Sequence, residues 1–276
     1  MNEPSAEPVS RSSIAVAAFS TVVEWYDFTL YLYLATVLSR VFFGGGETSL
    51  LVTLGGFAVA YLMRPLGAVY FGQFGDRFGR RRMTLRSVAV MTFAMLGIAL
   101  LPTYGQIGSV AAALMILLRC VMGFAVGGEY TGVVACLLEG APSQRRGLIV
   151  SLAAAASEVG ALLAVGVSTL TVLWLTPAQL DSWGWRIPFF VGGALAATVW
   201  IARSSMEESP DFIRQKSTGS ITTHPLRHAL SSHRAGIARG FAISALGSIT
   251  YYVGITYVPT FLFSVRALDE GTSLTL

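Results

Sequence analysis

Charged side chains stand inside long apolar runs of this sequence, where they could bind an anion or carry a proton. Counted from the start of each run at 1.5 Å per helical residue, they lie about 15 to 21 Å deep. That depth is near the middle of a membrane core about 30 Å thick. Charges there are costly and usually mark a functional pathway. We therefore predict proton or substrate binding by Glu24, Asp27, Arg64, Arg119 and Glu158, with Tyr31 on the same helix face and Glu129 deeper in its run.

The spacing within the first run groups part of this set. Glu24, Asp27 and Tyr31 stand at i, i+3 and i+7, so they share one face of a helix. Near mid-membrane, three carboxylates stand against two arginines, so pairing of both arginines leaves one acid without a countercharge. Burial disfavours the ionised form of such an acid, which could then load a proton on one side and release it on the other. We expect Glu24 or Asp27 to carry the proton, and Glu158 is the next candidate.

Two members of the set also have a structural interpretation. Arg64 precedes Pro65 and could satisfy carbonyl groups freed at a helix kink, as readily as it could bind a substrate. Glu158 stands among small residues and could be a hydrogen-bonding residue of a packing face. Both interpretations stay open at this point.

The composition indicates a membrane protein. Of the 276 residues, 54% are hydrophobic and 12% are charged, and the mean hydropathy is +0.64. Soluble chains carry about 25% charged residues. The net charge of +4 comes from Lys and Arg in short clusters between apolar runs, which argues against a nucleic-acid-binding surface. The N-terminus has acids and prolines where a secretory signal has basic residues, so we expect it to stay uncleaved.

Seven apolar runs are long enough, or nearly so, to cross a bilayer as helices. Basic clusters follow the second, fourth and sixth runs, whereas the other loops hold few basic residues. The positive-inside rule then predicts a multi-pass protein of the inner (plasma) membrane with a cytoplasmic N-terminus. The predicted spans are Ile14–Phe43, Leu50–Phe74, Met83–Leu101, Ile107–Leu138, Leu148–Leu175, Ile187–Ala202 and Ile237–Val265.

These spans divide the chain into four parts. They are a cytoplasmic N-terminus at residues 1–13, a six-helix half at 14–202, a cytoplasmic linker at 203–236, and the start of a second half at 237–276. The linker holds all the histidines. Since no cysteine or carboxylate framework accompanies them, we predict a solvated segment rather than a metal site for His224, His228 and His233.

The turn after the second span, residues 72–82, has an unusual pattern of glycines, one acid and several arginines. Such a turn joins two helices tightly and places fixed charges at the membrane surface. Arginines alone would be enough to orient the protein. Orientation explains neither Asp76 nor the spacing of the glycines.

This turn reads G-x-x-x-D-R-x-G-R-R-R and resembles the signature loop of the major facilitator superfamily. Other elements, in family order over roughly residues 20 to 265, resemble the metabolite:proton symporter family. They are Glu24–Phe28, Arg64–Gly67, Gly127–Gly132, Trp183–Phe189 and Glu207–Phe212. The resemblance implies twelve spans in two six-helix halves, with alternating access to a central cavity.

The chain departs from the family pattern at three places. Ser20 and Thr21 stand where the family usually has Gly-Asn, and Leu32 stands where a glycine is usual. Met122 replaces the glutamine of an R-x-x-Q-G pattern in the fourth span. All three lie on spans expected to line the cavity, so the substrate cannot be copied from a relative.

In the family, the acidic end of the fourth span typically pairs with arginines of the signature loop. The resemblance therefore implies a gate at the cytoplasmic face, closed by a charge cluster of Asp76, Arg80 and Glu139. The residues assigned to this gate are Gly72, Asp76, Arg77, Gly79, Arg80, Arg81, Glu139 and Arg145.

We predict an all-α integral membrane protein of major facilitator type, comprising the six-helix N-terminal half, the linker and about one span of the second half. The predicted function is proton-coupled symport of a small carboxylate or zwitterion, driven by the proton gradient without a cofactor. Expected partners are that small molecule, protons and the lipid bilayer, and no nucleic acid. One alternative is a drug/proton antiporter, although the balanced charges speak against it. Another is a membrane sensor that does not transport, although the sequence has no recognisable signalling domain.

The sequence has no catalytic triad, phosphate loop or metal motif, so we predict that it is not an enzyme. Transporters of this fold bind between two halves that rock against each other. We therefore expect this chain by itself not to transport.

Overall fold

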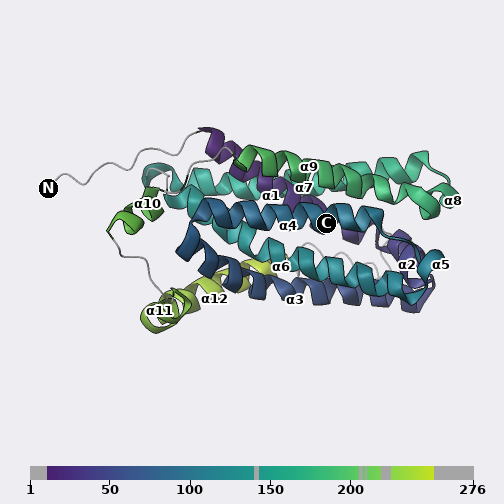
Figure 1. Cartoon of the computed structure of the whole chain (residues 1–276), viewed down its shortest axis with the longest axis horizontal. Helices are drawn as coiled ribbons and strands as arrows, with labels where there is room; N and C mark the ends of the chain where they lie inside the picture. Colours follow the sequence, from purple (N-terminus) through teal and green to yellow (C-terminus); the bar gives the residue numbers. More distant parts are fainter. Residues whose placement is uncertain (1–10, 140–142, 205–207, 209, 219–224, 252–276) are drawn as a thin grey trace. The chain divides into compact units, whose positions relative to one another are not determined.

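The computed structural model describes residues 11–139, 143–204, 208, 210–218 and 225–251, and all regular elements in these ranges are helical (Figure 1). The internal contacts divide the chain into two units, Met1–Thr223 and His224–Leu276. This boundary falls inside the predicted linker at 203–236.

The first unit holds most of the helices. They are α1 (Arg11–Tyr33), α2 (Ala35–Phe43), α3 (Glu47–Phe78), α4 (Arg80–Leu100), α5 (Tyr104–Ile107), α6 (Ser109–Glu139), the 3-10 turn η1 (Ser143–Arg145), α7 (Arg146–Trp174), α8 (Pro177–Gln179), the π-helical turn η2 (Leu180–Gly184), α9 (Arg186–Ser204) and α10 (Pro210–Ser217). The described part of the second unit contains α11 (Pro225–Ser232) and α12 (Arg234–Tyr251).

Among the described residues, five helices are long and apolar enough to cross a membrane. They match the second to sixth predicted spans and are Thr48–Phe78, Arg80–Leu100, Ser109–Glu129, Arg146–Trp174 and Arg186–Ser204. The first predicted span, Ile14–Phe43, is instead two helices interrupted at Leu34. Acidic and hydroxyl side chains make α1 less apolar than these five. The seventh predicted span begins within α12, and its residues after 251 lie outside the described part.

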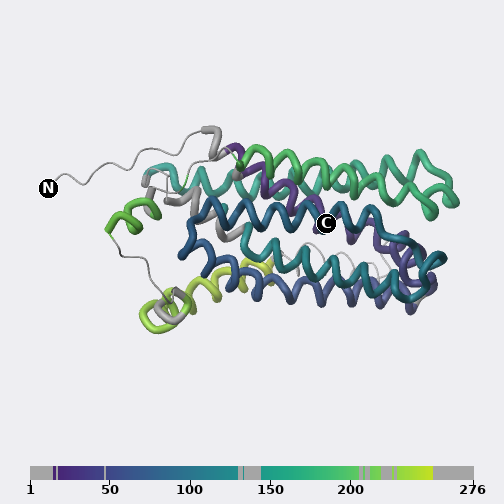
Figure 2. Tube along the Cα trace, in the orientation of Figure 1, coloured from purple at the N-terminus to yellow at the C-terminus, as the bar shows by residue number. Residues whose placement is uncertain are grey.

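The long helices of the first unit pack as a bundle. α1 lies along α7, α3 lies along α6, and α4 contacts both α6 and α9 (Figures 1 and 2). The core between them is built from large apolar side chains that are almost fully buried, among them Tyr26, Leu30, Met95, Trp185 and Phe189. The bundle therefore brings α1, α3 and α6 together, which carry most of the predicted site.

Glycines let α3 and α6 approach closely. A Cβ atom on Gly123 would overlap the carbonyl oxygen of Ala60, and one on Gly127 would overlap that of Arg64. On the opposite helix, a Cβ on Gly67 would overlap the carbonyl oxygen of Phe124. Such backbone contact is typical of helix pairs in membranes. It holds Arg64 on α3 close to α6, the helix that carries Arg119.

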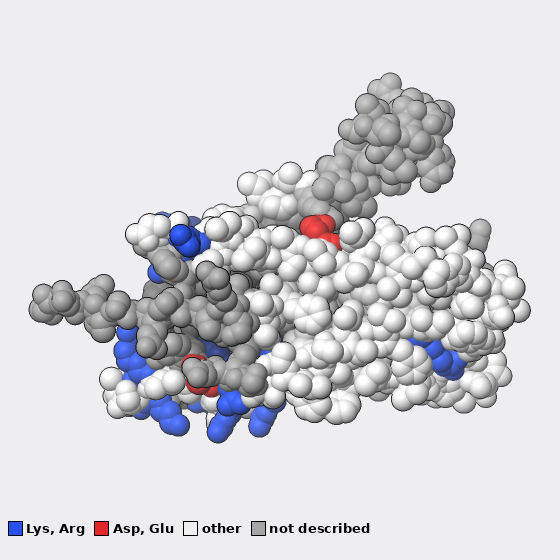
Figure 3. All heavy atoms as spheres, turned by 90° about the horizontal axis from the view of Figure 1, so that it is seen from above, with Lys and Arg blue, Asp and Glu red and all other residues white. Residues whose placement is uncertain are grey.

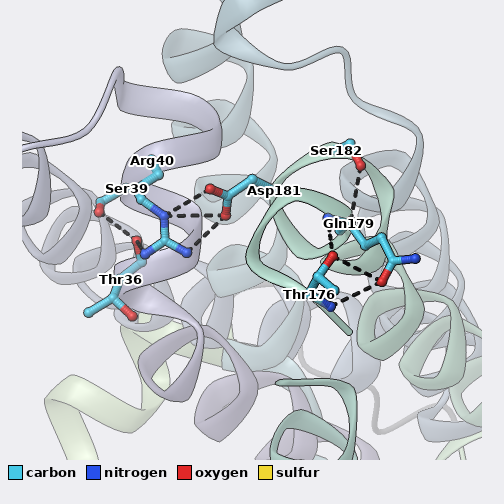
Figure 4. A network of polar contacts seen from close by, with 7 residues as sticks. All are labelled: Thr36, Ser39, Arg40, Thr176, Gln179, Asp181 and Ser182. Carbon is cyan, nitrogen blue, oxygen red and sulfur yellow. Dashed lines mark hydrogen bonds and ion pairs between the residues drawn. The ribbon is translucent and has the colours of Figure 1, made fainter. Parts of the chain in front are cut away.

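Two polar arrangements lie where α2 and η2 meet (Figure 4). Arg40 donates from Nε and Nη2 to the Asp181 carboxylate at 2.8 to 3.2 Å. At the start of α8, the Thr176 N–H donates to Gln179 Oε1 at 3.0 Å and the Gln179 N–H donates to Thr176 Oγ1 at 3.3 Å. This reciprocal pair is a capping box, which satisfies backbone donors at a helix start.

Candidate functional site

The centre of the site is a buried ion pair between α1 and α6. Arg119 donates from Nη1 to both carboxylate oxygens of Asp27, at 2.8 and 2.9 Å. Its guanidinium carbon lies 4.6 Å from the ring centroid of Tyr31, whose hydroxyl donates to the Thr53 carbonyl oxygen at 2.9 Å. The structure thus brings together the predicted residues Asp27, Tyr31 and Arg119.

A second pair joins α1 to α3. Arg64 Nη1 lies 3.4 Å from Glu24 Oε1. The other carboxylate oxygen of Glu24 is buried and has no hydrogen-bond partner in the structure. The guanidinium carbon of Arg64 lies 5.1 Å from the centroid of Phe28 and 4.9 Å from that of Tyr61. Arg64 therefore interacts with a carboxylate and two aromatic rings at once.

A small pocket opens between these helices. It is lined by Asp27, Phe28, Phe57, Ala60, Tyr61, Arg64, Arg119, Met122, Gly123 and Val126. The lining combines guanidinium groups, a carboxylate and aromatic faces on an apolar background. Arginines recognise carboxylates, and aromatic faces attract cations. The pocket therefore suits a small molecule that carries charge.

Glu129 belongs to a different cluster, which sequence reasoning did not anticipate. Its carboxylate pairs with Arg203 of α9 at 2.6 Å and accepts hydrogen bonds from Ser87 of α4 at 2.7 Å and from Ser20 of α1. All four side chains are buried. Arg203 directly follows the sixth predicted span, Ile187–Ala202, and its position indicates only membrane orientation. The unusual Ser20 was the signal for this contact, because it places a donor where the family has glycine.

Glu158 lies apart from the pocket. Its side chain is exposed on α7, and none of the ion pairs within the described residues involves it. The buried face of α7 is formed instead by small side chains such as Ala153, Ser157 and Ala164. Glu24 and Asp27 are both paired, so Glu158 is the one of the three acids predicted at mid-membrane that has no countercharge in the described part of the chain.

Most of the predicted gate residues lie at the turn between α3 and α4, whereas Arg145 lies in η1. Asp76 pairs with Arg80 at 3.1 Å. The side chain of Glu139 lies outside the described residues, so the predicted three-residue cluster is seen only in part. Arg77 and Arg145 are exposed, and the position of Gly72 opens onto empty space. On the face drawn in Figure 3, Lys and Arg side chains gather toward one end.

Glu208 reaches this turn from the segment after α9. Its Oε1 accepts from the Arg81 backbone N–H at 3.0 Å, and the Arg81 guanidinium donates to the Ser204 carbonyl oxygen. Gly79 has a φ of +104°, a conformation that other residues rarely adopt, and a Cβ there would overlap the Glu208 carboxylate. The Glu207–Phe212 element was noted in the sequence, but its contact with this turn required the tertiary structure.

Within the residues that the structure describes, no group of three or more His, Cys, Asp or Glu side chains could hold a metal ion. The pocket itself is lined by an ion pair, a second guanidinium and aromatic faces.

Known proteins resemble this chain in sequence. The profile of the family described as "Sugar (and other) transporter" matches residues 13–232. The "Glycine betaine/proline/ectoine/pipecolic acid transporter OusA" of Dickeya dadantii is 32% identical over 91% of this chain and 52% of that protein. The "Proline/betaine transporter" of Salmonella typhimurium is also 32% identical, over 91% of this chain and 53% of its own length.

Solved structures show the same fold. The crystal structure of a D-xylose–proton symporter superposes with a TM-score of 0.68 and 20% identity, covering 96% of this chain and 64% of that one. A partially occluded, inward-open structure of the xylose transporter XylE from E. coli has a TM-score of 0.71 and 20% identity, covering 96% and 66% of the two chains. These likenesses concern the fold alone.

The matched family and the relatives named above are transporters, not enzymes. Together with the long apolar helices, the family match indicates a multi-pass membrane protein. The chain belongs to the family described as "Sugar (and other) transporter", and its fold is of the major facilitator type. It spans about half the length of the curated relatives it matches, at 52% and 53% of the first two.

Proposed function

We propose that this chain forms the N-terminal half of a secondary transporter that imports a small zwitterion or carboxylate together with a proton. The observation that carries the proposal is the buried Asp27–Arg119 pair at the wall of the pocket. The relatives include proline and betaine transporters, which supports a zwitterionic substrate.

The proposed coupling is an exchange of carboxylates at Arg119. A substrate carboxylate binds the guanidinium in place of Asp27, because both are suited to the same charge-assisted hydrogen bonds. Asp27 then loses its countercharge inside an apolar bundle, where an unpaired charge is costly. It takes up a proton, so substrate and proton bind together. Asp27 is favoured over Glu24 because Arg119 pairs with Asp27, whereas Glu24 is held by Arg64.

The proposal includes an orientation and an energy source. The basic turn between α3 and α4 would face the cytoplasm, as would the N-terminus, in the inner membrane. The Asp76–Arg80 pair would belong to the inner gate. The proton gradient would drive transport without a cofactor, and a second half would close the cavity.

Uptake by proteoliposomes tests this function. The full-length transporter that contains these residues is reconstituted, and accumulation of labelled glycine betaine, proline, a dicarboxylate and a pentose is followed under an inward proton gradient. We expect accumulation of a zwitterion that a protonophore abolishes, and none with the 276-residue chain alone. Accumulation that is indifferent to the protonophore, or robust uptake by the short chain, would contradict the proposal.

A further inference from the structure

We propose that the rings of Phe28 and Tyr61 form the binding seat for the cationic head of the substrate, and that Arg64 occupies this seat until the substrate displaces it. The inference rests on the proposed function, in that the substrate is taken to be a zwitterion. It extends that function by assigning the cation-binding residues and an internal competitor.

The geometry of the seat is that of a cation site between two aromatic rings. The ring centroids of Phe28 and Tyr61 lie 6.1 Å apart, with planes tilted by 58°. The Arg64 guanidinium carbon lies 5.1 and 4.9 Å from these two centroids. Both distances are within the ~6 Å over which a ring attracts a cation. Both rings and Arg64 also line the pocket, so a ligand there could reach them.

The ion pair between Arg64 and Glu24 is incomplete while Arg64 stays on the rings. Its 3.4 Å separation is longer than the roughly 2.7–2.9 Å of a charge-assisted hydrogen bond. Glu24 Oε2 is buried without a hydrogen-bond partner. The rings and the carboxylate therefore share one guanidinium. If another cation takes the rings, Arg64 can move toward Glu24 and complete this pair, which offsets part of the cost of leaving the rings.

The same pocket offers a place for the opposite charge. Arg119 and Asp27 line it together with Phe28, Tyr61 and Arg64. A zwitterion can therefore replace two internal charges at once. Its carboxylate replaces Asp27 at Arg119, and its ammonium replaces Arg64 on the rings. A methylated ammonium fits best, because aromatic faces recognise such weakly hydrated cations. An uncharged sugar has no charge with which to make either exchange.

Binding of two matched probes to the full-length protein tests the seat. Glycine betaine and tert-butylacetate have the same shape and carboxylate, but a neutral carbon replaces the charged nitrogen in the second. Titration calorimetry should show betaine binding tighter by roughly five- to thirtyfold, as expected for a desolvated cation–π contact. Phe28→Leu or Tyr61→Leu should reduce this ratio to near one. Tyr61→Phe, which keeps the ring, should preserve it.

Phe93→Leu is the matched control. Phe93 is a 65% exposed aromatic residue on α4 that packs against Trp200, away from the pocket. Its substitution should leave the ratio of the betaine affinity to the tert-butylacetate affinity unchanged. Because the readout is a ratio of two affinities, a smaller fraction of folded protein does not alter it. If the ratio of the betaine affinity to the tert-butylacetate affinity stays high in both leucine variants, the proposal that these rings bind the cation is wrong.

Tetramethylammonium tests the internal competitor separately. The double variant Glu24→Gln/Arg64→Gln keeps the net charge of the pair and removes the guanidinium from the rings. It should bind tetramethylammonium at least about fivefold tighter than the unmodified protein. Unchanged or weaker binding would contradict the displacement by Arg64. If this gain appears but betaine does not bind at all, the seat stands and the proposed substrate class fails. If betaine is bound and accumulated but the leucine variants keep the ratio, the function stands and the seat is wrong.

Discussion

Arg203 Nη2 lies 2.6 Å from Glu129 Oε1, inside the bundle, and this contact joins α9 to α6. Serine hydroxyls from α1 and α4 donate to the same carboxylate. Four helices therefore meet at one acid. Breaking one partner of a buried pair leaves an uncompensated charge, whereas removing both does not.

This contrast gives the first prediction. Glu129→Gln or Arg203→Gln alone should lower the free energy of unfolding by about 3–5 kcal/mol. The double variant should lose less than the sum of the two single variants. Reversible unfolding in detergent would measure all three. Strict additivity would show that the pair does not couple these helices.

The exposed pair between Arg40 and Asp181 should behave differently. Their side chains are 44% and 38% exposed, so water and salt screen the interaction. A double-mutant cycle with Arg40→Ala and Asp181→Ala should give a coupling of about 1 kcal/mol or less. That coupling should vanish near 1 M salt. A coupling as large as that of the buried pair would be inconsistent with this account.

Asp27→Asn should separate transport from proton coupling. The amide cannot release a proton, so accumulation under a proton gradient should fall to equilibrium. Counterflow exchange should remain and become independent of external pH. Glu24→Gln is the comparison and should keep protonophore-sensitive uptake, because in our proposal Glu24 stays ionised. If the two variants behave the other way round, Glu24 and not Asp27 is the residue that carries the proton.

Two glycines on α7 offer a matched pair for packing. A Cβ on Gly160 would overlap the carbonyl oxygen of Val22 on α1, whereas one on Gly166 would meet no atom within 4 Å. Gly160→Ala should cost about 1–3 kcal/mol or more of stability by overpacking. Gly166→Ala should be neutral or stabilise by up to about 1 kcal/mol. Equal effects of the two substitutions on thermal unfolding would argue against close packing of α1 on α7.

Asp76→Asn should shift the conformational balance at the predicted gate. The Asp76–Arg80 pair at 3.1 Å would be lost, while the helices that enter the membrane stay unchanged. In the full-length protein, we expect faster labelling of a reporter cysteine on the cytoplasmic side of the cavity. Arg82→Gln removes an exposed charge from the same turn and should leave the rate unchanged. If Asp76→Asn leaves the labelling rate of the reporter cysteine unchanged, Asp76 is not part of the gate.

The helices and the site residues differ in how far they could be predicted. Long apolar runs with arginines at one end or both predicted α3, α4, α6, α7 and α9 with ends within a few residues, because the length and hydropathy of a span are local properties. The interruption at Leu34 was missed, because the run from 14 to 43 reads as one continuous helix. Spacing on α1 placed Glu24, Asp27 and Tyr31 on one face, and the structure keeps them buried there.

The sequence by itself determined that charged residues stand within apolar runs, because a charge within such a run is visible without knowledge of its neighbours. Only the tertiary structure decided which acid pairs with which arginine. Asp27 and Glu24 are close together on α1, but Arg119 comes from α6 and Arg64 from α3. Pairing depends on how those helices pack, which here follows from the glycine contacts between α3 and α6. For the same reason, the pairing of Glu129 with Arg203 could not be seen in the sequence: an ion pair within a bundle is a property of two surfaces brought together.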